Sequence, residues 1–298
     1  MKNILVTGAT GNVGAAVIKH LQCQEQPVQV FAGARNLVSA KEKFRDYKAL
    51  EYVQFDFEQP GTFESAFRNI DTVFLLRPPH ISDVNKYFRP LVSVLKEKQV
   101  GQIVFLSVQG AEKSKVIPHH KIETLIVEYG LDHVFLRPAY FMQNLTTTLL
   151  PDIRSKQKII LPAGKGKFNW IDIENIAEIA ALTLIRFSDY KNQAIELTGY
   201  ENRDFQEVVD LINAETGAQI EYQRVNPLKF YRIKKQQGMA RGMIMVMIML
   251  HFLPRIMKPP NISKSYELLT GKPPHTLRDF IRREKAGFVH QGNSTKQF

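Results

Sequence analysis

The sequence has little cysteine, and Cys23 is the only one among 298 residues. A single cysteine excludes an internal disulfide and any metal site built from several cysteines. Because Cys23 falls just after Leu21 in a predicted first helix, we expect packing or a plain surface thiol rather than catalysis. A basic-then-apolar leader is also missing, since a strand-like run follows Met1 at once, and we therefore expect a cytoplasmic protein.

Apolar runs of membrane-spanning length are lacking as well. The run 243–253 has eleven residues, whereas a spanning helix needs about 20. It lies in a segment, 239–257, that holds six of the eight methionines. We interpret this segment as a buried or dimer-interface helix, which leaves a homodimer open. The alternative is an adaptable methionine wall against a flat apolar substrate, with flanking basic residues in weak contact with a membrane surface.

Acidic residues are scarce in the last quarter of the chain. Residues 220–298 hold 15 Lys and Arg against 4 Asp and Glu, whereas residues 1–219 hold 25 of each. The whole formal net charge of +11 therefore belongs to the C-terminal part. A basic patch can attract nucleic acid, but no recognition motif accompanies it, so nucleic acid is the partner we favour least.

Short apolar runs alternate with helical patterns through the first half of the chain. Near-continuous apolar runs are typical of strands covered on both faces, and the alternation predicts an α/β fold with a doubly wound parallel sheet of the Rossmann type. The expected strands are 4–7, 28–33, 52–55, 72–76, 102–107 and 133–137.

The second half predicts a smaller C-terminal α+β substrate domain, residues 151–298. Residues 1–150 form the expected dinucleotide-binding domain, and 171–198 returns to it with a helix and a strand. The passage 151–170 carries two prolines and two glycines, so we expect it to be rich in loops and to cross to the second domain.

Three glycines, Gly8, Gly11 and Gly14, stand between the first expected strand and the first expected helix. Such a turn leaves backbone N–H groups unpaired at the positive end of the helix dipole, and an anionic diphosphate satisfies both. The spacing is G-x-x-G-x-x-G rather than the G-x-G-x-x-G of ordinary dehydrogenases. We therefore predict a dinucleotide site here, with a purely structural turn as the alternative.

The second expected strand leads to Arg35, where a site for NAD would place an acid. With Lys41 and Lys43 following, this position favours an anion, and the 2′-phosphate of NADP is one. The alternative is a solvated surface arginine. After the third strand, Asp56 could accept from an adenine amine and Phe57 could pack on the base. A capping Asp beside a core Phe fits these two residues nearly as well.

A catalytic Tyr-x-x-x-Lys is absent from the place where short-chain dehydrogenases carry it. Ile117 stands four residues before Lys121, so the usual acid, a tyrosine whose pKa a lysine lowers, is missing. The pair Tyr231 and Lys235 has the spacing but falls far too late in the chain, and we treat it as coincidence. His120 is a less favoured proton donor, and we expect no metal site because no third ligand stands at a useful spacing.

Several motifs together resemble the NmrA-like family of atypical short-chain dehydrogenases/reductases, which includes quinone and triphenylmethane reductases and redox-sensing regulators. The resemblance covers about residues 1–235. It rests on residues 8–14, Arg35, Asp56, Ser107, Lys121, 137–144 and 170–177.

This resemblance implies a set of cofactor contacts for NADP(H). The implied cofactor-binding residues are Gly8, Thr10, Gly11, Asn12, Val13, Gly14, Arg35, Asp56, Phe57, Leu76, Arg77, Pro78, Ser107, Lys121, Pro138, Tyr140 and Phe141. The candidate catalytic residues are Lys121, His120 and Tyr140.

Three functions remain open. The first is an NADPH-dependent reductase of a small, flat, lipophilic acceptor such as a quinone, for which close stacking matters more than a dedicated acid. The second is a non-catalytic regulator that senses NADP(H). The third, a scaffold on a membrane or nucleic acid, we rank last.

Overall fold

The computed structural model describes residues 1–24, 26–47 and 49–289. Contacts within the chain divide it into two compact units. Unit 1 contains residues 1–139, 173–197 and 264–273, and unit 2 contains residues 140–172, 198–263 and the described residues from 274 onward. Each unit is therefore assembled from three separate stretches of sequence.

Unit 1 is built on a seven-stranded parallel sheet with the strand order β10-β6-β5-β4-β1-β2-β3. The predicted doubly wound parallel sheet is confirmed, and each of the six expected strands lies within two residues of its observed ends. The strands are β1 Lys2–Val6, β2 Val28–Ala34, β3 Leu50–Gln54, β4 Thr72–Leu76, β5 Gln102–Leu106, β6 Asp132–Pro138 and β10 Gln193–Leu197.

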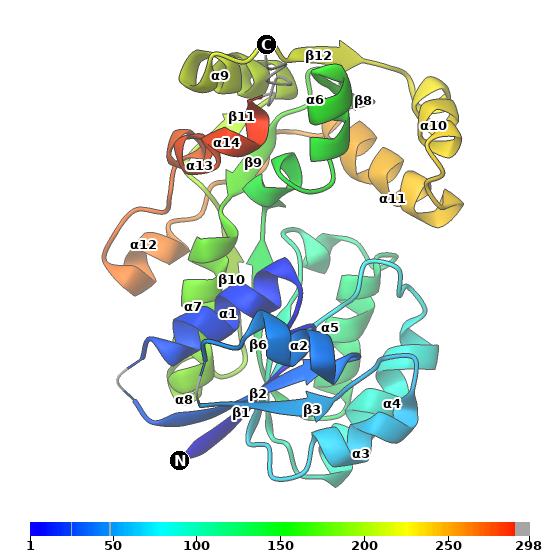
Figure 1. Ribbon diagram of the computed structural model, residues 1–298. Helices are drawn as coiled ribbons and strands as arrows, with labels where there is room; N and C mark the ends of the chain where they lie inside the picture. The colour runs from blue at the N-terminus through cyan, green and yellow to red at the C-terminus, as the bar shows by residue number, and fades with distance from the viewer. Residues whose placement is uncertain (25, 48, 290–298) are drawn as a thin grey trace, which may run out of the picture. The chain divides into compact units, whose positions relative to one another are not determined.

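Helices cover both faces of this sheet, which is why its strands are apolar on both sides. The helices α1 and α7 lie side by side over one face, and α3, α4 and α5 cover the other (Figure 1). The helices of unit 1 are α1 Asn12–Gln22, α2 Leu37–Lys43, α3 Phe63–Ala66, α4 Val84–Glu97, α5 Pro118–Glu128, α7 Ile173–Ile185, α8 Phe187–Tyr190 and α12 Ser265–Thr270.

The predicted return of the chain to the sheet takes place through α7 and β10. The strand β10 pairs in parallel with β6, with Ile195 opposite Leu136. The helix α7 packs against α1, where Glu174 pairs with Lys19 and His20 at 3.2 and 3.1 Å. Both contacts join residues far apart in the sequence, so the sheet is completed only after the chain has visited unit 2.

Unit 2 combines small sheets with helices, as expected for an α+β unit. One sheet has the order β11-β9-β7, and β12 pairs with β8. The strands are β7 Tyr140–Phe141, β8 Lys158–Leu161, β9 Phe168–Ile171, β11 Asn202–Arg203 and β12 Glu221–Arg224. The helices are α6 Leu150–Lys156, α9 Phe205–Thr216, α10 Pro227–Gln236, α11 Arg241–Phe252, α13 Leu277–Arg283 and α14 Lys285–Phe288.

The expectation that 151–170 is rich in loops is wrong, because α6, β8 and β9 take up most of this passage. Pro151 lies in the first turn of α6, where its missing N–H would have had no partner in any case. The other breakers, Pro162, Gly164 and Gly166, fall in the short connection between β8 and β9. Proline and glycine therefore mark the ends of the elements here.

The methionine-rich segment forms α11, and one side of this helix joins the hydrophobic core of unit 2. Ile244, Met247 and His251 are buried, whereas Met245 and Met249 are 52% and 47% exposed. The helix is thus half-buried. None of the helices in the described part of the chain has both the length and the apolar character that crossing a bilayer requires.

Candidate functional site

The glycine-rich turn joins β1 to α1 in the predicted order. Gly8 has a φ of +59°, in the left-handed region that favours glycine. A Cβ at Gly14 would lie 2.3 Å from the carbonyl oxygen of Gly8, so only glycine lets the helix approach the turn this closely. The N-cap of α1 is Gly11, which has no side chain to cap the first-turn N–H groups. The result is a cradle of main-chain N–H groups suited to an anion.

Two cations flank this cradle. The ammonium of Lys43, at the end of α2, donates to the carbonyl of Thr10 at 2.7 Å. Arg35 follows β2 directly, and its side chain is exposed. Residues 35–41 contain no Asp or Glu. An anion outside the end of β2 would therefore meet positive charge with no neighbouring carboxylate from this segment.

The end of β3 separates the two residues that were predicted to hold adenine. Phe57 is 5% exposed, and its ring centroid lies 4.9 Å from Phe55 and 5.2 Å from Phe88. Its ring is therefore part of the core, and the adenine contact expected of Phe57 is corrected. Asp56 is half-buried and accepts from the N–H of Glu58 at 3.0 Å. The alternative, a turn-forming Asp beside a core Phe, describes this pair.

The loop after β4 is held by Arg77. Its Nη1 donates to the carbonyls of Pro78 and Ile81 at 3.0 and 2.5 Å, and its Nε donates to Nε2 of His119 at 3.4 Å. Burial lowers the pKa of Arg77 from its ordinary value. The Arg77 guanidinium, which was expected to contact the coenzyme, thus serves to stabilise its own loop.

His119 supports this loop from α5 and stays neutral. Burial, and then the neighbouring charge of Arg77, lower the pKa of His119 to about 3. A neutral imidazole can accept the Arg77 hydrogen bond, whereas an imidazolium could not. His119 is therefore not a solvated residue at the start of α5, and its ring centroid lies 6.2 Å from that of Phe105.

Ser107, at the end of β5, belongs to a buried network that includes an ion pair. Its hydroxyl donates to Oε1 of Glu123 at 2.5 Å. Arg137 on β6 donates Nε and Nη2 to the two oxygens of the same carboxylate at 3.0 and 2.7 Å, and its Nη1 lies 3.1 Å from Glu112. The network ties β5, β6 and α5 together, so the Ser107 hydroxyl orients α5.

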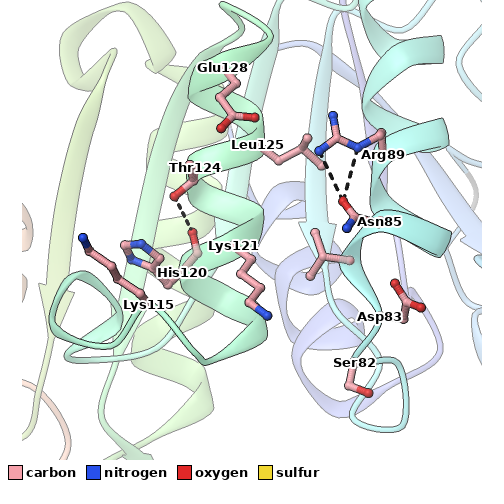
Figure 2. Close-up of a pocket in the computed structure, with 11 residues that line it drawn as sticks. Ser82, Asp83, Asn85, Arg89, Lys115, His120, Lys121, Thr124, Leu125 and Glu128 are labelled. Atoms are coloured by element: carbon pink, nitrogen blue, oxygen red, sulfur yellow. Dashed lines mark hydrogen bonds between the residues drawn. The ribbon is translucent and has the colours of Figure 1, made fainter.

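Lys121 and His120 both line a surface pocket of about 450 Å³ between α4 and α5 (Figure 2). Figure 2 shows the Lys121 side chain directed across the pocket toward the loop that carries Ser82 and Asp83. Nδ1 of His120 lies 3.0 Å from the carbonyl of Ala111, which can only accept, so Nε2 is the nitrogen without a proton in the neutral ring. The remaining lining residues are Val84, Asn85, Arg89, Lys115, Thr124, Leu125 and Glu128.

Tyr140 is partly buried and packs against the hydrophobic core of unit 2. Its hydroxyl donates to Nε2 of His251 at 2.9 Å, because Nδ1 of His251 donates to the carbonyl of Met247 at 2.7 Å. Burial raises the pKa of Tyr140 above its ordinary value. A phenol this weakly acidic does not fit the catalytic acid role expected of it, and that assignment is corrected. Phe141 continues β7 beside Ile171.

The remaining predicted contacts share one edge of the sheet. Carboxyl ends of parallel strands lie together, and ligands of such sheets bind outside that edge. Leu76 closes β4 and its N–H donates to Oγ1 of Thr7 at 2.9 Å, while Pro138 closes β6 and its carbonyl accepts from Gln109 at 2.9 Å. The structure therefore brings the ends of β1, β2, β3, β4, β5 and β6 to the edge where the glycine turn lies.

Comparison with known proteins places this site in a family. The profile of the NmrA-like family matches residues 1–268. The chain belongs to the NmrA-like family. It is 28% identical to prestalk A differentiation protein A of Dictyostelium discoideum over 94% of this chain and 91% of that protein. It is 26% identical to the NAD(P)H azoreductase of Xenophilus azovorans over 96% and 99% of the two chains.

Solved structures agree with the NmrA-like fold. One of them is the structure of the NADPH-dependent quinone oxidoreductase QOR2 of Escherichia coli complexed with NADPH. It matches this chain with a TM-score of 0.80 and 21% identity, and the match covers 94% of this chain and 99% of that chain. At this identity, the likeness describes the fold.

Sequence reasoning missed the roles of three residues in this NmrA-like chain. The contacts of Glu123 and His119 were not predicted, and His251 was seen only as part of an apolar run. Burial identifies Glu123 and His251, since a buried polar side chain needs a partner, and the hydrogen bond from Arg77 identifies His119. The available signal was Arg137, a basic residue inside an apolar strand run, which requires an acid nearby.

Proposed function

We propose that this chain is an NADPH-dependent reductase that delivers hydride to a flat, lipophilic acceptor such as a quinone. The observation that carries the proposal is the cradle at Gly8, Gly11 and Gly14, in which a Cβ at Gly14 would strike the turn and the first-turn N–H groups of α1 have no side-chain cap. The NAD(P)H azoreductase and the NADPH-dependent quinone oxidoreductase support it, since the one uses NAD(P)H and the other depends on NADPH.

The residues present fit the coenzyme. Main-chain N–H groups of Asn12 and Val13 bind the diphosphate at the start of α1. Arg35 and Lys43 bind the 2′-phosphate, where a carboxylate that would select NADH is absent. When bound, NADPH supplies a hydride from its nicotinamide ring.

The lipophilic acceptor suits a site without a dedicated acid. Ile117 occupies the position of the usual tyrosine, and the hydroxyl of Tyr140 is buried on His251. A conjugated acceptor spreads the arriving charge over its ring system, so water can protonate it afterwards. Lys121 and His120 remain as the candidate catalytic groups of α5, and we expect Lys121 to orient the nicotinamide ribose.

Calorimetry and turnover test this function together. Purified protein is titrated with NADPH and NADH, and NADPH oxidation is followed by its absorbance with a panel of quinones and azo dyes. We expect NADPH to bind more tightly than NADH and to be oxidised only when an acceptor is present. Absence of binding heat with either coenzyme contradicts the proposal.

Arg35→Ala is the selectivity variant in the same assays. Loss of a charge-assisted hydrogen bond to phosphate, about 1.5–3 kcal/mol, weakens NADPH binding by roughly ten- to a hundredfold. NADH binding stays unchanged, because NADH has no 2′-phosphate. Arg68→Glu, an exposed residue of unit 1 beyond α3, is the control. Equal loss for both coenzymes contradicts the role of Arg35.

The missing proton donor also favours a second function, a regulator that senses NADP(H) without turnover. Such a protein binds NADPH with the same Arg35 dependence but oxidises none with any acceptor of the panel. The turnover assay therefore separates the two functions, while calorimetry tests what they share.

A further inference from the structure

The outer side of α11 presents an apolar ridge to solvent. We define the α11 ridge as Met245, Val246, Met249, Leu250 and Leu253, which are 52, 42, 47, 43 and 41% exposed. Their spacing places them on one side of the helix and its 3-10 continuation, since steps of one, three and four residues return to the same face. Because α11 is apolar on both sides, we expect its exposed side to contact an apolar environment other than the core of unit 2.

The orientation of α11 is set by polar contacts as well as by packing. His251, on the side opposite the ridge, accepts from the hydroxyl of Tyr140 at 2.9 Å and donates to the carbonyl of Met247 at 2.7 Å. Rotating the helix to bury the ridge would break the Tyr140 bond inside a buried aromatic cluster. The ridge is therefore held outward by the structure of unit 2.

The segment that carries the ridge has charge of one sign. Residues 222–266 contain nine Lys and Arg and no Asp or Glu. Arg241 begins α11, Lys258 follows its end, and both are exposed. The neighbouring helix α10, which packs on α11 (Figure 1), adds exposed Lys229, Arg232 and Lys235. Apolar side chains framed by cations are the pattern of a helix that lies in the surface of an anionic bilayer.

We propose that the α11 ridge docks unit 2 onto an anionic lipid surface. The ridge side chains enter the boundary between headgroups and acyl chains, and the surrounding cations contact the anionic headgroups. A second copy of the chain is the other occupant to consider. A two-fold interface through this ridge would set the same basic segment, which contains no acidic residue, against itself, and like charges facing each other oppose association.

Vesicle sedimentation tests this docking with the full chain. Vesicles of phosphatidylcholine, with or without phosphatidylglycerol, are mixed with protein at low and high salt. We expect binding to the phosphatidylglycerol vesicles only, and a loss of binding at 1 M salt, where the screening length falls to about 3 Å. No sedimentation with phosphatidylglycerol at low salt overturns the proposal.

Two variants separate the apolar and the electrostatic parts. Met245→Gln with Met249→Gln removes apolar surface from exposed positions, and we expect binding to fall by about tenfold or more. Arg241→Glu with Lys258→Glu is expected to lower binding at least about thirtyfold, from roughly fivefold for each cation lost. Unchanged binding in both variants overturns the proposal.

The matched control is Val127→Gln with Arg68→Glu, an exposed apolar residue and an exposed cation of unit 1. It should bind vesicles as the wild type does, and circular dichroism and the Tm should show that every variant is folded. Light scattering without vesicles gives the mass. A dimer that the Met245→Gln and Met249→Gln changes dissociate, together with no vesicle binding, assigns the ridge to a second copy and overturns the proposal. The vesicles contain neither coenzyme nor acceptor, so this outcome leaves the reductase proposal untouched.

Discussion

At the scale of single residues, the structure separates positions that depend on main-chain geometry from those that depend on side-chain partners. The glycine turn is of the first kind, because any side chain at Gly14 meets the carbonyl of Gly8. Tyr140 and His251 are of the second kind, because each depends on the other's polar atoms. We therefore expect a substitution at Gly14 to displace the main chain of the turn, and a substitution at Tyr140 or His251 to leave the other residue without its hydrogen-bond partner.

Gly14→Ala is expected to weaken NADPH binding by more than tenfold and to lower stability by about 1–3 kcal/mol. The new Cβ would lie 2.3 Å from the carbonyl oxygen of Gly8, so the turn must shift and its N–H groups move away from the diphosphate. Calorimetry and urea unfolding measure the two effects. Gly61→Ala is the control, because nothing lies within 4 Å of its Cβ position, and equal behaviour of the two variants would contradict the argument.

Stability should fall as the pH drops below about 6.5. Burial lowers the pKa of His251 to about 4, so between these values the unfolded chain binds a proton that the folded chain does not. The stabilisation is full above the unfolded pKa of about 6.5 and is lost as the pH falls toward 4, on the order of 3 kcal/mol. His119, with its pKa of about 3, acts in the same direction.

Urea unfolding at pH 7 and pH 5 measures this dependence. His251→Gln keeps an acceptor for Tyr140 but cannot be protonated, so its stability should change less with pH than that of the wild type. His80→Gln, at an exposed position, should keep the wild-type slope. If the stability of His251→Gln changes with pH as much as that of the wild type, another group causes the loss of stability at low pH.

At the scale of elements, polar contacts decide how α5 lies on the sheet. The carboxylate of Glu123 is buried and receives hydrogen bonds from Ser107 and Arg137, on two neighbouring strands. These hydrogen bonds to the sheet fix the position of α5, the helix that carries Lys121 and His120. The position of the pocket in Figure 2 depends on them.

Arg137→Ala should destabilise the chain by about 3–5 kcal/mol, because it leaves a buried carboxylate without its cation. Arg137→Leu combined with Glu123→Leu should recover part of the loss, since no unpaired charge remains. Arg186→Ala, which breaks an exposed pair with Asp189, should unfold close to the wild type. Urea unfolding measures the free energy of unfolding of each of the three variants. An Arg137→Ala variant as stable as Arg186→Ala would contradict a structural role for the ion pair.

At the scale of the whole molecule, two units are interleaved in the sequence, and the coenzyme cradle belongs to unit 1. A ligand that binds only the folded state stabilises it by mass action, by about 2.7 kcal/mol at a hundred times its Kd. NADPH should therefore raise the Tm by several degrees, and NADH at the same concentration by less. Arg35→Ala should remove the difference between the two coenzymes, and a thermal scan in which NADH protects as well as NADPH would reject the selectivity argument.

The sequence alone determined the features that depend on neighbouring residues. Alternation of apolar runs and helical patterns was enough for the parallel sheet, and Gly8, Gly11 and Gly14 between strand and helix were enough for the turn. Backbone conformation follows largely from local side chains and spacing, so these features can be found without tertiary contacts.

Only the tertiary structure decided what the side chains at the site do. Phe57 and Arg77 were predicted as coenzyme contacts, yet one packs in the core and the other holds its loop. Tyr140 was a candidate acid until His251, 111 residues away, proved to be its partner. A side chain's acidity and availability depend on whatever the fold buries around it, and that information is spread over the whole chain.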